Sequence, residues 1–486
     1  MPEDASATAK LSPRKARLRE ISDRWAPERD AFVARNQAFH DDDRRFLRFV
    51  VPAGQSVLEI GCGTGGLLAA LEPARGVGID FAPRMVEIAR ADHPGLTFVA
   101  GDIEDPETVR ALGLDGTFDA IVVADTIGML DDCQATLAAL LKLCHPGTRL
   151  IVAYHNALWE PGLRLAERFH LKMPEPLTNW LRPADIANLL RLAGFEPVRE
   201  EWRQLIPKRL WGVGTFINRF VATLPLIRRL CLRHYLIARP AARAREKLSA
   251  SVIVPCRNER GNIEAIVRRI PQFCDELEIV FVEGGSSDGT WDELGRVKAA
   301  NPGRDIKVLK QDGKGKGDAV RKGFAEASGE ALIILDADMT VAPEELPKFY
   351  ELLASGQAEF VNGTRLVYPL ERDSMRFLNR IANHFFSLLF TWLLNQRFTD
   401  TLCGTKALRR QDYAHIAAGR AYFGDFDPFG DFDLIFGAAK LSLKVVEVPI
   451  RYQARSYGET NISRFRHGLL LLRMVGFAYA KLKAIS

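Results

Sequence analysis

Two aspartates, Asp336 and Asp338, follow the apolar run 331–335. Such a run is typical of a strand buried on both faces of a sheet, and side chains two residues apart project from the same face. Two carboxylates at the end of a buried strand are costly unless a cation meets them. Mg²⁺ or Mn²⁺ with a pyrophosphate group would do so, because these hard ions take oxygen ligands. An isolated pair of this spacing is also typical of solvated acids in a turn.

A second set of residues lies far upstream, where a strand-like run ends in Gly61, Gly63 and Gly65 and a helical pattern begins. Glycines at such a turn let the backbone approach a ligand, and the start of a helix offers free N–H donors. Asp80 ends the next strand-like run, in a position to accept hydrogen bonds from a ribose diol. Glu59 precedes the glycines, and Asp102 ends a third run. This combination indicates a nucleotide cofactor.

The elements that must position these residues form two series of strand-like runs separated by helical patterns. Strands that alternate with helices predict a parallel sheet, so both series are expected to be α/β domains. The predicted organisation is a helical lead-in (1–44), a first α/β domain (45–202), a basic amphipathic bridge (203–247) and a second α/β domain (248–486).

The composition is that of a globular protein, with 486 residues of which 47% are hydrophobic and 26% charged. A net charge of +5 is too small to indicate nucleic-acid binding, and none is expected. The seven cysteines show no C-x-x-C pair, which predicts reduced thiols in the cytoplasm. The N-terminus has no apolar core, and no run is long enough for a membrane span, so neither a secretory signal nor a spanning helix is expected.

The bridge 203–247 carries eleven Lys or Arg residues against one acid, interleaved with aromatic and aliphatic side chains. That combination suits an anionic membrane surface, and Arg228, Arg229 and Arg233 are expected to face it. The apolar stretch 374–395 is a second candidate for contact with the membrane. The alternative is that both stretches pack against the domains.

The stretch "VLEIGCGTGG" resembles the glycine motif E/D-x-G-x-G-x-G of class I methyltransferases that use S-adenosylmethionine, and the similarity extends over roughly 45–205. Gly66 keeps the dinucleotide pattern G-x-G-x-x-G formally open. The resemblance implies a Rossmann-like domain in which Glu59 and the glycines lie near the methionine moiety. It places Asp80 at the ribose, and Asp102 with Ile103 at the adenine. His155 and Asp125, at strand ends, are candidate bases, although a lone histidine there is more often structural.

The second series resembles the family 2 glycosyltransferases with the GT-A fold, over roughly 249–475. The motifs that carry the resemblance are "SVIVPCRNERGNI", "VFVEGGSSDGTW", the pair of aspartates, "DTLCGTKALRR" and "RYQARSYGETN". The last of these is similar to the branch that makes polyprenyl-phosphate sugars. Gly284 departs from the family, which usually has a second acid there, so the base of the donor nucleotide is left open.

The resemblance implies a role for each matching residue. Pro255, Arg257, Glu259, Glu283 and Arg365 would bind the nucleotide sugar, Asp336 and Asp338 the metal and diphosphate, and Arg376, Lys406 and Arg455 the acceptor phosphate. Asp433 would be an acid near the acceptor, with Asp431 as a second candidate.

The sequence therefore predicts a bifunctional transferase that uses S-adenosylmethionine and a divalent metal (Mg or Mn) and works on the inner face of a membrane. The first domain would transfer a methyl group, and the second would transfer a sugar from a nucleotide sugar to a polyprenyl phosphate. One alternative is glycosyl transfer to a saccharide or glycolipid hydroxyl, which would need a general base. In another, either domain is a scaffold that binds its ligand without turnover.

Overall fold

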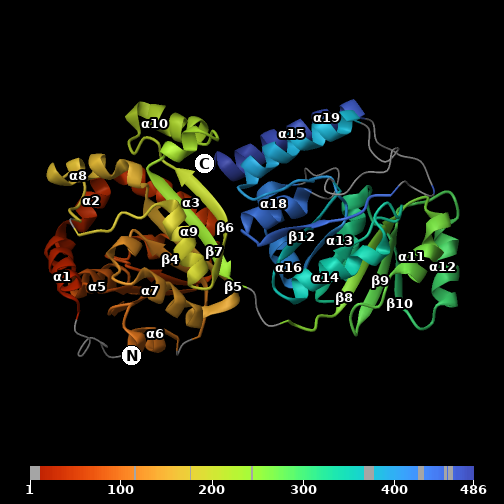
Figure 1. Cartoon of the computed structure of the whole chain (residues 1–486), viewed down its shortest axis with the longest axis horizontal. Coiled ribbons are helices and arrows are strands. Elements are labelled where there is room, and N and C mark those ends of the chain that lie inside the picture. Colours follow the sequence, from red (N-terminus) through yellow and green to blue (C-terminus); the bar gives the residue numbers. More distant parts are fainter. Residues whose placement is uncertain are drawn as a thin grey trace. The chain divides into compact units, whose positions relative to one another are not determined.

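A computed structural model describes residues 11–113, 116–175, 177–241, 245–365, 377–424, 432–453, 457 and 464–485; the side chains of 377–384 and 464–469 are not described. The chain divides into two compact units (Figure 1). Unit 1 comprises Met1–Ala241 with Lys483–Ser486, and unit 2 comprises Ala242–Leu482.

Unit 1 contains a seven-stranded sheet in the order β3-β2-β1-β4-β5-β7-β6. The strands are β1 (Ser56–Ile60), β2 (Arg75–Asp80), β3 (Thr97–Ala100), β4 (Phe118–Ala124), β5 (Cys144–His155), β6 (Phe195–Arg203) and β7 (Arg233–Pro240). The first five pair in parallel, and β7 is antiparallel to both of its neighbours. The strand order reverses between β1 and β4, and in open α/β sheets ligands bind outside the carboxyl ends of the strands at such a point.

Unit 2 contains a second seven-stranded sheet in the order β10-β9-β8-β11-β13-β12-β14. The strands are β8 (Ala250–Cys256), β9 (Leu277–Glu283), β10 (Asp305–Lys310), β11 (Ala331–Ile334), β12 (Phe360–Thr364), β13 (Lys406–Arg409) and β14 (Val445–Pro449). Only β13 runs antiparallel to its neighbours among these described pairings. The predicted fold class, a Rossmann-like domain followed by a GT-A domain, is confirmed.

Helices flank both sheets (Figure 1). The α-helices of unit 1 are α1 (Pro13–Trp25), α2 (Arg29–Arg35), α3 (Gln37–Val50), α4 (Gly66–Ala70), α5 (Pro83–Asp92), α6 (Pro106–Gly113), α7 (Cys133–Leu140), α8 (Glu160–Arg168), α9 (Pro183–Leu192) and α10 (Val213–Phe216). Those of unit 2 are α11 (Ile263–Arg269), α12 (Thr290–Ala300), α13 (Lys316–Glu326), α14 (Leu346–Ala354), α15 (Phe377–Leu394), α16 (Arg410–Ala418), α17 (Arg420–Phe423), α18 (Phe432–Lys440) and α19 (Arg464–Ala478).

The apolar run before the two aspartates is a central strand, as predicted. Every residue of β11 is fully buried between β8 and β13, and its apolar side chains belong to the core of unit 2. Burial on both faces explains why the run has no polar alternation. The first polar side chain after it is Asp336, so the acids lie at the carboxyl end of the sheet.

The segment 203–247 does not form one continuous element. Residues 233–240 are β7, which pairs with β5 and β6 inside the sheet of unit 1, and residues 204–232 form an excursion from the sheet between β6 and β7. Arg233 is completely buried, so the expectation that it faces a membrane was wrong. Its guanidinium forms ion pairs with Asp43 and Asp125, which compensate the charge inside the sheet.

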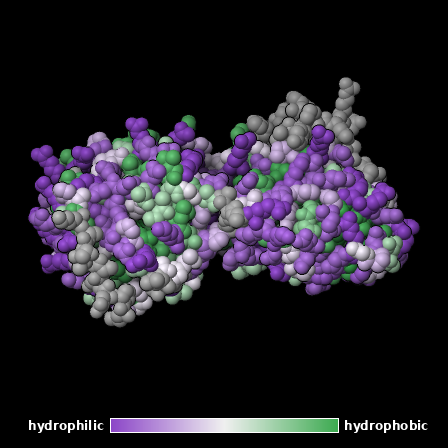
Figure 2. Space-filling model, turned by 60° about the horizontal axis from the view of Figure 1, so that its bottom comes forward, coloured by the Kyte–Doolittle hydropathy of each residue, from purple (hydrophilic) through white to green (hydrophobic). Residues whose placement is uncertain are grey.

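The face of the molecule in Figure 2 is mostly hydrophilic, with smaller apolar areas on each unit. Within the described ranges, no helix is both long enough and apolar enough to cross a membrane.

Candidate active sites

The glycine turn of unit 1 connects β1 to α4 in a conformation that favours glycine. Gly61, Gly63 and Gly65 all have positive φ (73°, 53° and 79°), where a side chain would be strained. A Cβ on Gly61 would also overlap the side chain of Thr126, and one on Gly63 would meet the guanidinium of Arg29. The backbone of the turn, which has no side chains at these positions, therefore packs directly against Thr126 and Arg29.

Asp80 ends β2 and braces this turn. Its two carboxylate oxygens accept the N–H groups of Gly63 and Ala82, each at 2.9 Å. Burial raises the pKa of the Asp80 carboxyl, and the two backbone donors offset only part of that effect. The residue predicted to hold a ribose thus also positions the loop beside it.

A cavity of about 300 Å³ opens at this edge of the sheet, in the usual size range of ligand pockets. A smaller cavity continues from Asp80 toward the third strand. Five of the predicted cofactor residues line these two cavities, namely Gly61, Gly63, Asp80, Asp102 and Ile103. Glu59 and Gly65 are not among the lining residues.

Glu59 lies in the interior behind the glycine turn. Desolvation raises the pKa of its carboxyl to about 8, and Arg29 and the backbone at Leu68 oppose the shift. Among the described residues, its Oε2 is buried with no hydrogen-bond partner. Glu59 thus lies behind the cavity lining, and its predicted position beside the methionine moiety remains a prediction.

The helices before the sheet supply part of the cavity wall, a contribution that the sequence analysis did not anticipate. The large cavity is lined by Arg29 and Phe32 of α2 and by Phe39 and His40 of α3. The smaller cavity is lined by Lys15 of α1. No spacing within 1–44 indicates this, because the contacts join the lead-in to strand ends far away in the chain.

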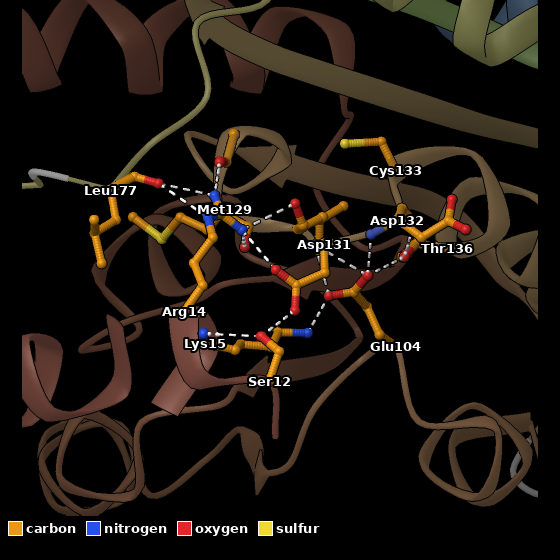
Figure 3. Close-up of polar contacts among 12 residues, drawn as sticks. Ser12, Arg14, Lys15, Glu104, Met129, Asp131, Asp132, Cys133, Thr136 and Leu177 are labelled. Atoms are coloured by element: carbon orange, nitrogen blue, oxygen red, sulfur yellow. Dashed lines mark hydrogen bonds and ion pairs between the residues drawn. The ribbon is translucent and has the colours of Figure 1, made fainter. Parts of the chain in front are cut away.

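Lys15 is only 5% exposed and forms an ion pair with Asp102. It forms a second ion pair with Glu104 (Figure 3). Burial alone would raise the pKa of Glu104, but the N–H of Asp131 and the Lys15 ammonium hold it below its usual value. Arg14, next to it, donates to the carbonyls of Gly128 (2.8 Å) and Leu177 (2.9 Å). The start of α1 is thereby fixed over the edge of the small cavity.

In unit 2 the two predicted metal ligands lie beyond β11. The Oδ1 of Asp336 is 2.6 Å from Nζ of Lys316, the first residue of α13. Asp338 accepts hydrogen bonds from the N–H (3.1 Å) and the hydroxyl (2.8 Å) of Thr340. Burial would raise the pKa of Asp336, but Lys316, Lys406 and Arg365 together lower it. Lys406 and Arg365 therefore lie close enough to Asp336 for their charges to lower its pKa, which places these three predicted residues in one site.

The residues predicted to hold the nucleotide follow the neighbouring strands. Glu283, at the end of β9, is buried and accepts the N–H of Ser286. Arg257 is exposed, Pro255 is half-buried, and buried Glu259 accepts the amide of Asn262 at 2.7 Å. A Cβ on Gly284 would contact Gln311 Oε1, so a glutamine faces the place of the missing second acid.

The other residues predicted for this site differ in their surroundings. Arg365 forms a bidentate ion pair with Asp400 (2.6 and 2.8 Å), and the charge of Asp400 raises the pKa of Arg365 above its ordinary value against the effect of burial. Lys406 is fully buried and donates to the carbonyl of Cys403. Asp433 is buried and paired with Arg420 at 2.8 Å. Arg376, Arg455 and Asp431 lie outside the described residues.

Most exposed apolar side chains of unit 1 lie in two places. One is the excursion, residues 204–232 between β6 and β7, and the other is α8 with the residues just after it. Trp211 is fully exposed and Leu226 is 85% exposed, and Phe169 follows α8 with 65% exposure. The excursion contains no acid, and Lys208, Arg209, Arg219 and Arg229 are all exposed on it. Helix α15 differs, because Phe386, Phe390 and Leu393 are buried while Phe385 and Leu388 are exposed.

Comparison with known families identifies the two domains that carry these sites. Residues 28–200 match the profile described as "Methyltransferase domain", and residues 251–416 match "Glycosyl transferase family 2". The chain thus carries a methyltransferase domain and a family 2 glycosyltransferase domain, as the sequence predicts.

The glycosyltransferase part is similar to enzymes named for polyprenyl-phosphate substrates. It is 30% identical over 221 residues to the "Dolichol-phosphate mannosyltransferase" of Pyrococcus furiosus, covering 44% of this chain and 59% of that protein. It is 26% identical over 233 residues to the "Undecaprenyl-phosphate 4-deoxy-4-formamido-L-arabinose transferase" of Sodalis glossinidius, covering 47% and 65%. The chain spans less than two thirds of the length of either relative.

A solved structure similar to unit 1 is the SAM-dependent methyltransferase, possible histamine N-methyltransferase, of Thermotoga maritima. The sequence identity is 19% and the TM-score 0.36, and the match covers 46% of this chain and 99% of that one.

Proposed function

We propose that the chain is a bifunctional transferase with two separate sites. Unit 1 would transfer a methyl group from S-adenosylmethionine, and unit 2 would transfer a sugar from a nucleotide sugar to a polyprenyl phosphate with the help of a divalent metal ion. The observation that carries the proposal is that each sheet ends in its own acid-bearing site, with Asp80 at the glycine turn in one and the Asp336–Asp338 pair in the other.

The residues around the glycine turn fit S-adenosylmethionine. Asp80 lines the cavity at the end of β2, where a ribose diol would donate to it, and Arg29 lies against Gly63, where a carboxylate group would be attracted. Asp102 and Ile103 line the smaller cavity next to Asp80, and the resemblance to methyltransferases assigns them to the adenine. When bound, the cofactor supplies an electrophilic methyl group on a sulfonium sulfur.

The aspartate pair of unit 2 fits a divalent ion that also binds substrate phosphates. Mg²⁺ typically uses one or two carboxylates, substrate oxygens and waters, so two aspartates are a sufficient protein contribution. The cationic surroundings keep Asp336 ionised, and a carboxylate is the form that binds a metal. Within the described residues no group of three or more metal-ligating side chains occurs, which accords with an ion held partly by substrate. The ion would neutralise the leaving diphosphate.

A phosphate acceptor accords with the state of Asp433. A polyprenyl phosphate is already ionised at neutral pH, so transfer needs alignment more than proton removal. A hydroxyl acceptor would need a general base, and Asp433 is engaged by Arg420. The names of the two relatives support the same acceptor class.

We also propose that unit 1 binds an anionic lipid surface through the excursion 204–232. Its exposed Trp211 and Leu226 would enter the interface between water and lipid, and its exposed cations would face the headgroups. All seven cysteines are unpaired thiols, which suits a reducing compartment. The proposed location is therefore peripheral, on the cytoplasmic face of a membrane.

The proposal is tested by thermal denaturation of the full chain with S-adenosylmethionine, and separately with a panel of nucleoside diphosphate sugars plus Mn²⁺. A ligand that binds only the native state raises its melting temperature by mass action. We expect S-adenosylmethionine and one sugar nucleotide each to raise a transition, the latter only with metal. If neither ligand shifts any transition, the proposal is wrong.

A further inference from the structure

The cavity of unit 1 contains a histidine–aspartate pair that cofactor binding does not use. β4 and β5 are parallel neighbours, and their carboxyl ends carry Asp125 and His155 at the same edge of the sheet as the glycine turn. Nδ1 of His155 is 3.0 Å from Oδ1 of Asp125, and both residues line the large cavity together with Gly61 and Asp80. The histidine therefore has a charged partner and faces the ligand space.

Asp125 is held in place as an anion. Arg233, completely buried in β7, forms an ion pair with it and reaches Asp43 of α3 at 2.9 Å. Burial would raise the pKa of Asp125, but Arg233 and His155 hold it well below its ordinary value. Asp125 also has a positive φ of 55°, a conformation uncommon for non-glycine residues that is retained only where the surroundings enforce it.

His155 has the orientation of a proton acceptor. Its ring stacks on Phe39 with an interplanar angle of 4° and a centroid distance of 5.8 Å. Because Nδ1 faces a carboxylate, it is the nitrogen that carries the proton in the neutral ring, which leaves the lone pair on Nε2. Within the described part of the chain, Nε2 has no hydrogen-bond partner.

We infer that His155 accepts the proton of a hydroxyl group on the methyl acceptor, and that Asp125 is the positioning residue that fixes its ring. This inference rests on the proposed methyl transfer. As the new C–O bond forms, the C–S bond breaks and its electron pair stays on sulfur. The hydroxyl proton passes to Nε2 of His155 and then to water. A neutral amine would not need this base to begin its attack, so the pair favours an oxygen acceptor.

The rest of the cavity indicates the body of that acceptor. The segments that follow β5 in the chain contribute apolar lining residues, which include Leu163, Ala166, Leu171, Met173, Pro207 and Leu232. They also contribute Lys172, Glu175 and Lys208, and Lys172 is paired with Glu167 and Glu175. We therefore assign the acceptor to the hydroxyl compounds that carry an apolar group.

The test uses the full chain with S-adenosylmethionine and two probes of equal tail length, 4-octylphenol and 4-octylaniline. The variants are His155→Gln and Asp125→Asn. The control is His145→Gln, which removes a second histidine–aspartate pair (His145–Asp119, 3.0 Å) at the opposite ends of β4 and β5. Release of S-adenosylhomocysteine measures turnover, calorimetry measures cofactor binding, and nitrogen-15 NMR reports the tautomer of His155.

We expect the wild type to methylate the phenol and His155→Gln to lose about 10²–10⁴-fold in rate, with cofactor affinity unchanged. Asp125→Asn should lose rate and also the Nδ1–H tautomer, whereas His145→Gln should match the wild type. The inference is overturned if His155→Gln keeps the wild-type rate, if Nε2 carries the proton, or if a wild type that binds the cofactor methylates only the aniline or neither probe. A wild type that does not bind S-adenosylmethionine would instead remove the proposed function of unit 1.

Discussion

Aspartates at strand ends behave in opposite ways in the two units, and Asp80 is buried whereas the side chain of Asp336 is 27% exposed. In unit 1, burial raises the pKa of Asp80, whose described hydrogen bonds come from neutral backbone N–H groups. In unit 2, Asp336 is subject to the same burial effect, but Lys316, Lys406 and Arg365 lower its pKa. The sign of the shift is set by the partners, because desolvation penalises the charged form in both places.

The difference indicates what each acid can bind. A carboxylate whose hydrogen-bond donors are neutral suits the neutral hydroxyls of a ribose. A carboxylate that neighbouring cations keep ionised suits a site that binds a metal ion together with a diphosphate. One residue type thus serves two chemistries, and the surroundings decide which.

The largest effect is expected when the charge of the metal-binding pair is removed. Asp338→Asn and Asp336→Asn keep the side-chain shape but remove the counter-charge of the ion, so glycosyl transfer should fall about 10²–10³-fold or more. Asp312→Asn is the control, since Asp312 is a 73% exposed partner of Lys322 near the same site. Rates measured over a range of Mn²⁺ concentrations check this, and wild-type turnover by either variant at low metal would show that the pair is structural.

A smaller effect is expected at the neutral site. Asp80→Asn removes a buried acceptor of charge-assisted hydrogen bonds, a loss of about 1.5–3 kcal/mol, so the affinity for S-adenosylmethionine should fall roughly 10- to 100-fold. Calorimetry of the full chain measures this, with Asp119→Asn, at the opposite end of β4, as the control. Equal affinities of Asp80→Asn and the wild type would remove Asp80 from the cofactor site.

The surfaces of the two units also differ, because most exposed apolar side chains of the described residues belong to unit 1. Arg219→Ser with Arg229→Ser should weaken binding to anionic vesicles by about 5- to 30-fold, at ~1 kcal/mol for each cation. Arg24→Ser with Arg110→Ser is the control, since both arginines are exposed elsewhere on unit 1. Vesicle flotation at low salt decides the matter, and equal flotation of both double variants would contradict the surface assignment.

The last prediction concerns stability and not activity. The pKa of Glu59 is about 8 in the folded chain, above its ordinary value of 4.5, so the folded state retains a proton that the unfolded state loses in this range. The free energy of unfolding should therefore fall as pH rises from 4.5 to about 8, by at most about 1.4 kcal/mol per pH unit.

Glu59→Gln should flatten that dependence, whereas Glu72→Gln, on an exposed side chain, should not. The measurement is urea unfolding at several pH values, following the transition that S-adenosylmethionine shifts. An identical slope in Glu59→Gln and the wild type would show that Glu59 is ionised inside the fold.

The features predicted from sequence were those encoded locally. The buried strand before Asp336 and the glycine turn after β1 each follow from a few consecutive residues, and so does the alternation that defines two mostly parallel sheets. The antiparallel strands β7 and β13 were not predicted. Lys15 and Arg29 were missed because they reach the cofactor cavity across the fold from helices before the first strand. Arg233 was misplaced for the same reason, since its acid partners Asp43 and Asp125 lie 190 and 108 residues away in the chain.

The most direct test of two independent sites is one glycosyl-transfer assay on three full-length proteins, the wild type, Asp80→Asn and Asp338→Asn, with a polyprenyl phosphate, Mn²⁺ and the sugar nucleotide found by thermal denaturation. The account predicts that the wild type and Asp80→Asn form a polyprenyl-phosphate sugar at equal rates and that Asp338→Asn forms almost none. If Asp338→Asn keeps the activity, or if Asp80→Asn loses it as completely, the assignment of one chemistry to each unit is contradicted.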